Sequence, residues 1–343
     1  MRPDLTKVII AAGENSMHDA EKELVQYFPN ASFCALTSGV FICGIPGSFA
    51  DFSKQVRKNN ICFTRHIFPI LAEDTLTGGT EDAETVLRNF DAIKSAIAGK
   101  QIAVHATILD GKTAGYTKIE LILPLLKSLT DDGFILSPRG AAEIISIVVF
   151  GGKLYMGVSM ARDNLSSWPL GRSRFLFEKD QISRAEFKML DTIEQFDINL
   201  RKYKTGVDLG AAPGGWTRIL LKHGIKVIAV DPAKMDKRLN KYSNFSHYQG
   251  LSQKFFKTHP GKYDIIVNDM RMDVKSSVGI MNDAAEFLHD GGIAIMTLKL
   301  NPTRQLAEVS YAKDALSKKY NIIGARQLFH NRSEVTMVLK NRA

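Results

Sequence analysis

A glycine-rich segment between a short apolar strand and a helical pattern is the first candidate for binding chemistry. It reads Val207-Asp208-Leu209-Gly210-Ala211-Ala212-Pro213-Gly214-Gly215-Trp216, and the helical pattern continues to Lys222. Glycine has no Cβ and accepts positive φ values, so such a turn lets the backbone pack closely against a bound molecule. A helix that follows offers free N–H groups in its first turn. The segment therefore predicts a cofactor pocket.

The spacing of this turn argues against a dinucleotide as the cofactor. Dinucleotide sites have the pattern G-x-G-x-x-G, whereas this turn is G-A-A-P-G-G, and Pro213 has no N–H to offer a pyrophosphate. Asp208 lies two residues before the first glycine, and Asp231 closes the next predicted strand. An acidic residue at that second position is typical of a site that binds a ribose hydroxyl.

The turn resembles the S-adenosylmethionine (SAM) site of the FtsJ-type ribose 2′-O-methyltransferases, which implies SAM as the cofactor. The expected SAM-binding residues are Asp208, Gly210, Ala211, Ala212, Pro213, Gly214, Gly215, Trp216, Asp231, Gln249 and Asp269. For the Trp216 side chain, packing is the simpler role. Enzymes of this type usually place an aspartate for the adenine amino group after the third strand. This chain has Gln249 there, so either its carbonyl oxygen or the backbone is expected to bind adenine.

Several acceptors of a methyl group are excluded by residues that the second half lacks. Methylation of a pyrimidine at C5 needs a thiolate, and residues 171–343 contain no cysteine. Radical chemistry needs closely spaced cysteines for an iron–sulfur cluster, which are also missing. Methylases of base amino groups carry an N-P-P-Y-like turn after the fourth strand, where this chain has Asn268-Asp269-Met270-Arg271. A hydroxyl group remains as the acceptor.

Four charged side chains are candidates for activating that hydroxyl group. Asp269 follows a predicted strand, Lys299 closes the next one, and Glu334 opens the last. Lys188 lies before the first strand of the series. Attack on a methyl group requires an aligned oxygen that loses its proton. Two ammonium groups and two carboxylates balance in charge, and Lys188 near Lys299 favours loss of the Lys299 proton. Taken alone, each residue is better explained by a surface ion pair.

The order of these residues resembles the Lys-Asp-Lys-Glu tetrad of FtsJ-type enzymes. The motifs are S-R-A-E-F-K ending at Lys188, D-M at Asp269, a lysine that closes the following strand, and R-S-E-V around Glu334. The resemblance implies that Lys188, Asp269, Lys299 and Glu334 are catalytic and that no metal takes part. It implies the fold of these enzymes as well.

Longer segments are similar to the RlmM branch of this family, which methylates a cytidine ribose of 23S rRNA. They are Asn-Asp-Met at 268–270, Leu-Lys-Leu-Asn-Pro at 298–302 and residues 325–336. Fainter similarity covers residues 61–72 and 159–175. Members of the branch carry an N-terminal ferredoxin-like region and a THUMP domain. The resemblance implies a SAM-dependent rRNA ribose methyltransferase whose partner is 23S rRNA.

Charge and composition fit a protein that binds a polyanion. The net charge of +9 is divided unevenly, with +11 on residues 171–343 and −2 on residues 1–170. A basic surface around a cofactor site indicates a nucleic acid as substrate. Taken by itself, the charge is also explained by a basic face that contacts only solvent. We expect a cytosolic protein, because no apolar run is long enough to span a bilayer and the first residues lack a signal-peptide core. No obligate protein partner is inferred.

The three cysteines give no sign of a metal site or a disulfide. Cys34, Cys43 and Cys62 are odd in number, lack C-x-x-C spacing and have no clustered histidines nearby. Buried, reduced thiols are therefore expected.

The two halves of the chain have different sequence patterns, which predict different folds. The first half alternates short strands and helices and predicts an α+β, ferredoxin-like and THUMP-type region. The second half predicts a Rossmann-like, doubly wound α/β methyltransferase domain that ends in an antiparallel hairpin. Its expected helices begin at 183, 216, 275 and 303, and its expected strands are 206–209, 226–231, 245–249, 263–267, 292–298, 321–328 and 334–340. The predicted domains are 1–75 (ferredoxin-like), 76–165 (THUMP-like and RNA-binding), 166–182 (linker) and 183–343 (methyltransferase).

Two alternatives remain open from the sequence. One is a SAM-dependent methyltransferase of a protein or a small molecule. The other is a non-catalytic RNA-binding factor for ribosome assembly that keeps the fold, against which the intact glycine turn and tetrad argue.

Overall fold

The computed structural model describes residues 5–111 and 115–342. The chain forms two compact units, Met1–Arg172 and Ser173–Ala343. Among the described residues, the structure contains no helix with the length and apolar character needed to cross a membrane.

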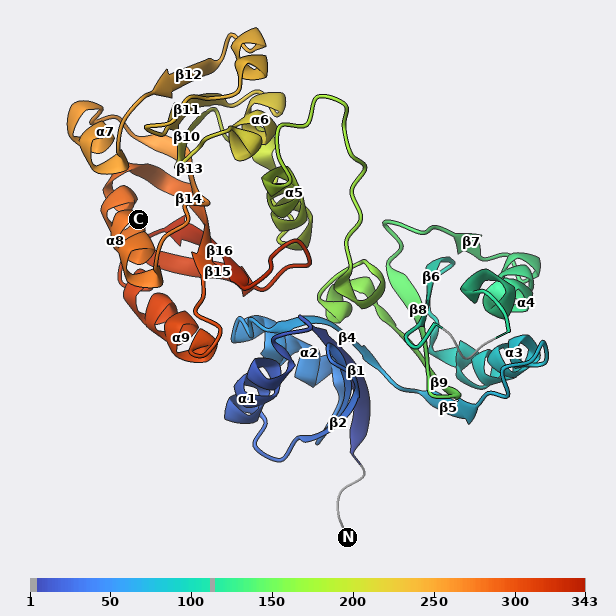
Figure 1. Cartoon of the computed structure of the whole chain (residues 1–343). Coiled ribbons are helices and arrows are strands. Elements are labelled where there is room, and N and C mark those ends of the chain that lie inside the picture. Colours follow the sequence, from blue (N-terminus) through green and yellow to red (C-terminus); the bar gives the residue numbers. More distant parts are fainter. Residues whose placement is uncertain (1–4, 112–114, 343) are drawn as a thin grey trace. The chain divides into compact units, whose positions relative to one another are not determined.

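The first sheet of the N-terminal unit has the βαββαβ order of a ferredoxin-like fold. Its elements are β1 (Thr6–Ala12), α1 (Met17–Tyr27), β2 (Ser32–Thr37), β3 (Val40–Ile45), α2 (Phe49–Lys58) and β4 (Thr64–Pro69). The strands are antiparallel in the order β2-β3-β1-β4, and both helices cover one face (Figure 1). The apolar run of β1 is buried because this strand is central. The ferredoxin-like prediction is confirmed.

The second sheet of this unit is mixed and packs against two helices (Figure 1). Its strand order is β5 (Ala72–Thr75), β9 (Lys153–Met160), β8 (Glu143–Phe150), β6 (Gln101–Ile108) and β7 (Ile135–Leu136), with helices α3 (Asp82–Ile93) and α4 (Lys118–Asp131). Short 3₁₀ helices are η1 (Lys94–Ala96), η2 (Ala161–Asn164) and η3 (Pro169–Gly171). The sequence predicts a hairpin over 143–159 that turns at Gly151-Gly152; β8 and β9 confirm it, and both turn glycines have positive φ. The division of this unit into 1–75 and 76–165 stays a prediction.

The sequence predicts extended structure throughout the segment 61–72, but within it the chain turns and passes from the first sheet to the second. The turn after β4 leads into β5, and the Leu71 N–H donates to the Met156 carbonyl at 2.8 Å. Next to it, a Cβ at Gly157 would lie 1.8 Å from the Pro69 carbonyl oxygen. The close approach of the two backbones therefore requires glycine in β9.

The C-terminal unit is the predicted doubly wound α/β domain. Its elements are α5 (Ala185–Gln195), η4 (Leu200–Lys202), β10 (Thr205–Leu209), α6 (Gly215–Lys222), β11 (Lys226–Val230), η5 (Lys237–Lys241), β12 (Phe245–Tyr248), α7 (Ser252–Thr258), β13 (Tyr263–Asn268), α8 (Val274–Ala284), η6 (Ala285–Phe287), β14 (Leu288–Lys299), α9 (Gln305–Leu316), β15 (Tyr320–Arg326) and β16 (Glu334–Asn341). The strand order is β12-β11-β10-β13-β14-β16-β15, with only β16 antiparallel to its neighbours. Helices α5 and α6 cover one face and α8 and α9 the other (Figure 1).

Three details differ from the sequence-based expectation. The sequence predicts a helix over 275–289, but α8 ends at Ala284 because a 3₁₀ turn leads directly into β14. Helix α7 was not predicted, since its seven residues are too few to show a helical period. All three cysteines are free, but Cys34 is exposed, so the prediction of burial was wrong for it. It lies on β2, the edge strand of its sheet.

The close approach at Gly157 can be tested by substitution. We expect Gly157→Ala to lower the free energy of unfolding of the N-terminal unit by about 1–3 kcal/mol, because the added Cβ forces two backbones apart. Denaturant unfolding would measure the change. The control is Gly279→Ala in α8, where a Cβ meets nothing within 4 Å and alanine favours the helix. Equal effects of the two substitutions would contradict the packing argument.

Candidate active site

The glycine turn lies at the point where the order of the strands in the sheet reverses. It follows β10, which pairs with β11 on one side and β13 on the other, and ligands of doubly wound sheets bind beyond strand ends at this place. Gly210 and Gly214 have φ values of +69° and +116°, and α6 begins at Gly215. A Cβ at Gly210 would lie 2.1 Å from Met270 Cγ. The turn is therefore close to the residues that follow β13.

Two other predicted cofactor residues lie beyond the neighbouring strands. Asp231 follows β11, and its carboxylate accepts from the Ala212 N–H at 3.0 Å and the Ala233 N–H at 2.7 Å. Gln249 follows β12, is exposed, and donates from Nε2 to the Pro232 carbonyl at 3.1 Å. Both residues thus share the sheet edge from which the glycine turn emerges.

Trp216 and Asp208 lie beneath the turn. The Trp216 ring is buried in the core, and its Nε1 donates to the Ala185 carbonyl at 2.8 Å, so its packing role is confirmed. The buried Asp208 carboxylate accepts from Thr217 Oγ1 at 2.6 Å and ties β10 to α6. Burial raises the pKa of Asp208 to about 7.

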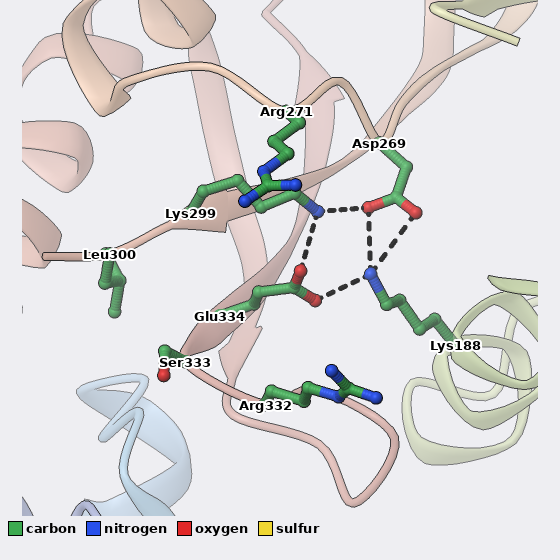
Figure 2. A pocket seen from close by; sticks show the side chains of 8 residues that line it. All are labelled: Lys188, Asp269, Arg271, Lys299, Leu300, Arg332, Ser333 and Glu334. Carbon is green, nitrogen blue, oxygen red and sulfur yellow. Dashed lines mark hydrogen bonds and ion pairs between the residues drawn. The ribbon is translucent and has the colours of Figure 1, made fainter. Parts of the chain in front are cut away.

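The structure brings the four predicted catalytic side chains together (Figure 2). Lys188 Nζ lies 3.3 Å from both Asp269 carboxylate oxygens and 2.7 Å from Glu334 Oε2. Lys299 Nζ lies 3.0 Å from Glu334 Oε1 and donates to Asp269 Oδ1. Each ammonium therefore contacts both carboxylates. The side chains are 16–19% exposed, so the cluster is partly withdrawn from water.

Strand register and strand ends account for this arrangement. Lys299, the last residue of β14, stands directly opposite Glu334, the first residue of β16. Opposed residues of antiparallel strands point to the same face, which places their charges within reach of each other. Asp269 follows the adjacent β13, and Lys188 is supplied by α5. Four segments far apart in the sequence thus meet at one sheet edge.

Electrostatics keeps Lys188 and Asp269 ionised. Burial alone would lower the pKa of Lys188, but the carboxylates of Asp269 and Glu334 outweigh it and raise the value. Burial would likewise raise the pKa of Asp269, and Lys299 and Lys188 lower it instead. Lys188 is therefore the ammonium group that holds the two carboxylates in place.

A pocket of about 480 Å³ opens on this cluster. Beyond the four charged groups it is lined by Arg271, Leu300, Arg332 and Ser333. The Arg271 and Arg332 side chains flank the cluster in Figure 2. Both arginines are exposed and form no ion pair within residues 5–111 and 115–342. The pocket thus combines a charge-balanced base with a cationic rim.

Two uncharged side chains support the cluster. Thr297, two residues before Lys299 on β14, donates to Asp269 Oδ1 and accepts from Lys299 Nζ, both at 2.5 Å. Buried Asn331 donates to Glu334 Oε2 at 3.4 Å and accepts from Thr336 Oγ1 at 3.1 Å. These contacts fix the directions of the two carboxylates.

The sequence interpretation missed Arg271, Thr297 and Asn331 as parts of the site. Arg332 begins the R-S-E-V motif, and the sequence allows two roles for it, contact with RNA phosphates or ordinary solvation. A signal for Thr297 existed, because residues two apart on a strand share a face, and a polar side chain there faces the same way as Lys299. For Asn331 no pattern signalled a role, since a turn asparagine is ordinary.

Comparisons with known proteins agree with this geometry. The family model for the FtsJ-like methyltransferases matches residues 181–322. Residues 181–322 form an FtsJ-like methyltransferase domain. The chain is therefore a methyltransferase, and Lys188, Asp269 and Lys299 lie inside the matched residues, while Glu334 lies in β16 beyond them.

Relatives extend the similarity beyond the methyltransferase domain. The chain is 29% identical over 245 residues to the ribosomal RNA large subunit methyltransferase M of Pseudomonas syringae pv. tomato, covering 67% of each chain. For the protein of the same name from Ectopseudomonas mendocina, identity is 29% over 317 residues, covering 88% of this chain and 87% of the relative. Among solved structures, TrmN from Thermus thermophilus aligns with a TM-score of 0.42 and 15% identity, covering 98% of this chain and 100% of TrmN.

The buried carboxyl beneath the turn gives a pH-dependent stability. The folded pKa of Asp208, about 7, lies above its ordinary value of 3.8, so the folded state binds more protons between these values. Stability contributed by this group therefore falls as the pH rises from about 4 to 7 and is constant above. We expect Asp208→Asn to remove this loss.

The measurement is the melting temperature of both proteins from pH 5 to pH 8.5. The wild type should fall below the Asn variant by a gap that widens up to about pH 7 and then stays level. Parallel curves over the whole range would show that Asp208 keeps an ordinary pKa.

Proposed function

We propose that the chain is a SAM-dependent RNA ribose 2′-O-methyltransferase that acts on a cytidine of 23S rRNA. The cluster of Lys188, Asp269, Lys299 and Glu334 beside the glycine turn carries the proposal. A charge-balanced site with no thiol suits a hydroxyl acceptor. The relatives named ribosomal RNA large subunit methyltransferase M support rRNA as the substrate.

The residues at the strand ends suit SAM. The two positive-φ glycines, Gly210 and Gly214, leave no room for a Cβ, and the first turn of α6 presents N–H groups to a carboxylate. Asp231 is placed to accept from ribose hydroxyls, and Gln249 or nearby backbone would bind adenine. When bound, SAM supplies a methyl group on a positively charged sulfur.

The proposed reaction uses one lysine as base and the other as support. Lys188 stays protonated because of the two carboxylates around it, and Asp269 and Glu334 hold the Lys299 side chain in position. Lys299 acts after it has lost its own proton to solvent, and its amine then orients the ribose 2′-hydroxyl and takes the hydroxyl proton. The 2′-oxygen bonds to the methyl carbon while the carbon–sulfur bond breaks and its electron pair stays on sulfur. Atoms and charge then balance without a metal.

RNA as the acceptor is supported by charge and chemistry. Residues 171–343 carry a net charge of +11, and Arg271 and Arg332 flank the cluster where phosphates of a bound strand would lie. Only RNA offers a 2′-hydroxyl. In this proposal the THUMP-like region 76–165 delivers the target segment to the methyltransferase domain.

Methyl transfer to rRNA tests the proposed base. With labelled SAM and rRNA from cells lacking this protein, we expect the wild type to transfer methyl groups and Lys299→Ala to be slower by about 10²–10⁴-fold, the usual loss for a general base. Mapping alkali-resistant positions would identify the nucleotide.

The matched control is Lys262→Ala, an exposed lysine that precedes β13 and so lies at the opposite end of this strand from Asp269. It should keep full activity. Equal rates for Lys299→Ala and the wild type would refute the mechanism, and transfer to protein but not to RNA would refute the substrate.

The glycine turn makes a separate prediction about SAM. Gly210→Ala places a Cβ 2.1 Å from Met270 Cγ at a φ of +69°, so we expect S-adenosylhomocysteine affinity to fall at least about tenfold. Isothermal titration calorimetry would measure it. Gly279→Ala, where the Cβ meets open space, should bind as the wild type does. Unchanged affinity in Gly210→Ala would place the cofactor elsewhere.

A further inference from the structure

A second pocket adjoins the one that opens on the charged cluster. Its volume is about 470 Å³, and it shares Lys188, Arg332 and Glu334 with the first. Its remaining walls are Arg184, Ala185, Phe187, Phe329 and His330. Because the two pockets share three side chains, a ligand that fills the first can continue into the second.

The walls of this second pocket carry positive charge that is not neutralised locally. Arg184 and Arg332 are both exposed, and in the part of the chain that the structure describes neither guanidinium forms a hydrogen bond or an ion pair. The carboxylate of Glu334 is already taken by Lys188 and Lys299. Two free guanidinium groups in one pocket favour an anion that accepts several hydrogen bonds, as a phosphate does.

The same pocket presents aromatic rings. Phe187 and His330 lie with their ring centroids 5.2 Å apart, and Phe329 meets His330 edge to face, also at 5.2 Å. The Phe329 residue is 37% exposed although it is a large apolar side chain. An exposed ring next to free guanidinium groups is the combination with which proteins bind single-stranded nucleic acid, since every base has a face that stacks.

The turn that supplies Phe329 and His330 is held in place before any ligand binds. The Asn331 side-chain oxygen Oδ1 accepts from the Leu328 N–H at 3.0 Å and from Thr336 Oγ1 at 3.1 Å. The Gln327 side chain donates to the Arg332 carbonyl at 3.2 Å. A preformed turn loses little conformational freedom on binding.

We propose that this second pocket binds the nucleotide that directly neighbours the methylated one in the RNA strand. Its base stacks on Phe329, and the phosphate that joins the two nucleotides lies between Arg184 and Arg332. Lys188, shared by both pockets, faces the acceptor ribose. The inference rests on the proposed function and adds to it a site that sets how the target strand enters.

The probe is a six-nucleotide RNA that contains one cytidine and 2-aminopurine directly 5′ or directly 3′ of it. Stacking on an aromatic ring quenches 2-aminopurine fluorescence. Titrated into the full chain with S-adenosylhomocysteine, one of the two probes should be quenched. Phe329→Ala should abolish the quenching and weaken binding about tenfold, while Phe329→Trp should restore both.

Charge and control variants complete the experiment. Arg184→Gln should weaken binding a few-fold and reduce the slope of log affinity against log salt by about one. The controls are Tyr311→Ala, an exposed ring on α9, and Arg201→Gln, an exposed arginine of the same unit. Both should match the wild type, and thermal melts should show all variants folded.

The outcomes separate this inference from the proposed function. In one outcome the wild type methylates rRNA, but Phe329→Ala and Arg184→Gln bind the probe RNA as their controls do. This result overturns the proposed role of the second pocket and leaves the proposed function intact. Quenching that depends on Phe329 without methyl transfer to any rRNA supports the pocket as an RNA site and overturns the function. Absence of quenching with either probe overturns the inference.

Discussion

Mutual neutralisation of four partly buried charges is the constraint on which the catalytic end of this molecule depends. An isolated ammonium or carboxylate at 16–19% exposure would lose much of its hydration without compensation. Each of the four groups instead contacts two of opposite sign. Removing any one leaves an uncompensated charge among the other three, so the stability of each group depends on the presence of all the others.

That constraint determines which elements must meet. A carboxylate has to follow β13, a lysine has to end β14, and α5 has to pack so that Lys188 reaches both acids. The doubly wound order brings the ends of adjacent strands to a single edge, and the glycine turn after β10 opens the space beside them. Asp208 and Trp216 then join that turn to the core from below. Chemistry and packing thus use the same strand ends.

Sequence reasoning recovered the parts of the molecule that leave a local signal. Alternating strands and helices predicted the sheet around β10, and the spacing of Gly210 and Gly214 predicted positive φ values that the backbone shows. Motif order predicted the four charged side chains. The supporting contacts of Thr297 and Asn331 could not be predicted in this way, because they depend on the register between segments distant in sequence.

Errors came from features that composition does not encode. Cys34 was expected to be buried like other thiols, but its place on an edge strand exposes it. The short helix α7 leaves no period to detect. Likewise the pocket lined by Phe329 and Arg184 joins a helix start with a turn near the end of the chain, and no pattern within either segment indicates that they meet.

The pairing of Lys299 with Glu334 has a consequence for how this domain can change over time. A slip of one residue between β14 and β16 would turn Glu334 to the opposite face and at the same time move the buried Val335, Met337 and Leu339 to the other helix-covered face, where they do not fit. Folding stability and the site therefore reject the same insertions within these strands. Residues 327–333 lie outside the paired ladder, so the exposed Phe329 and Arg332 can change while the Lys299–Glu334 pairing and the Asn331 contact to Glu334 are preserved.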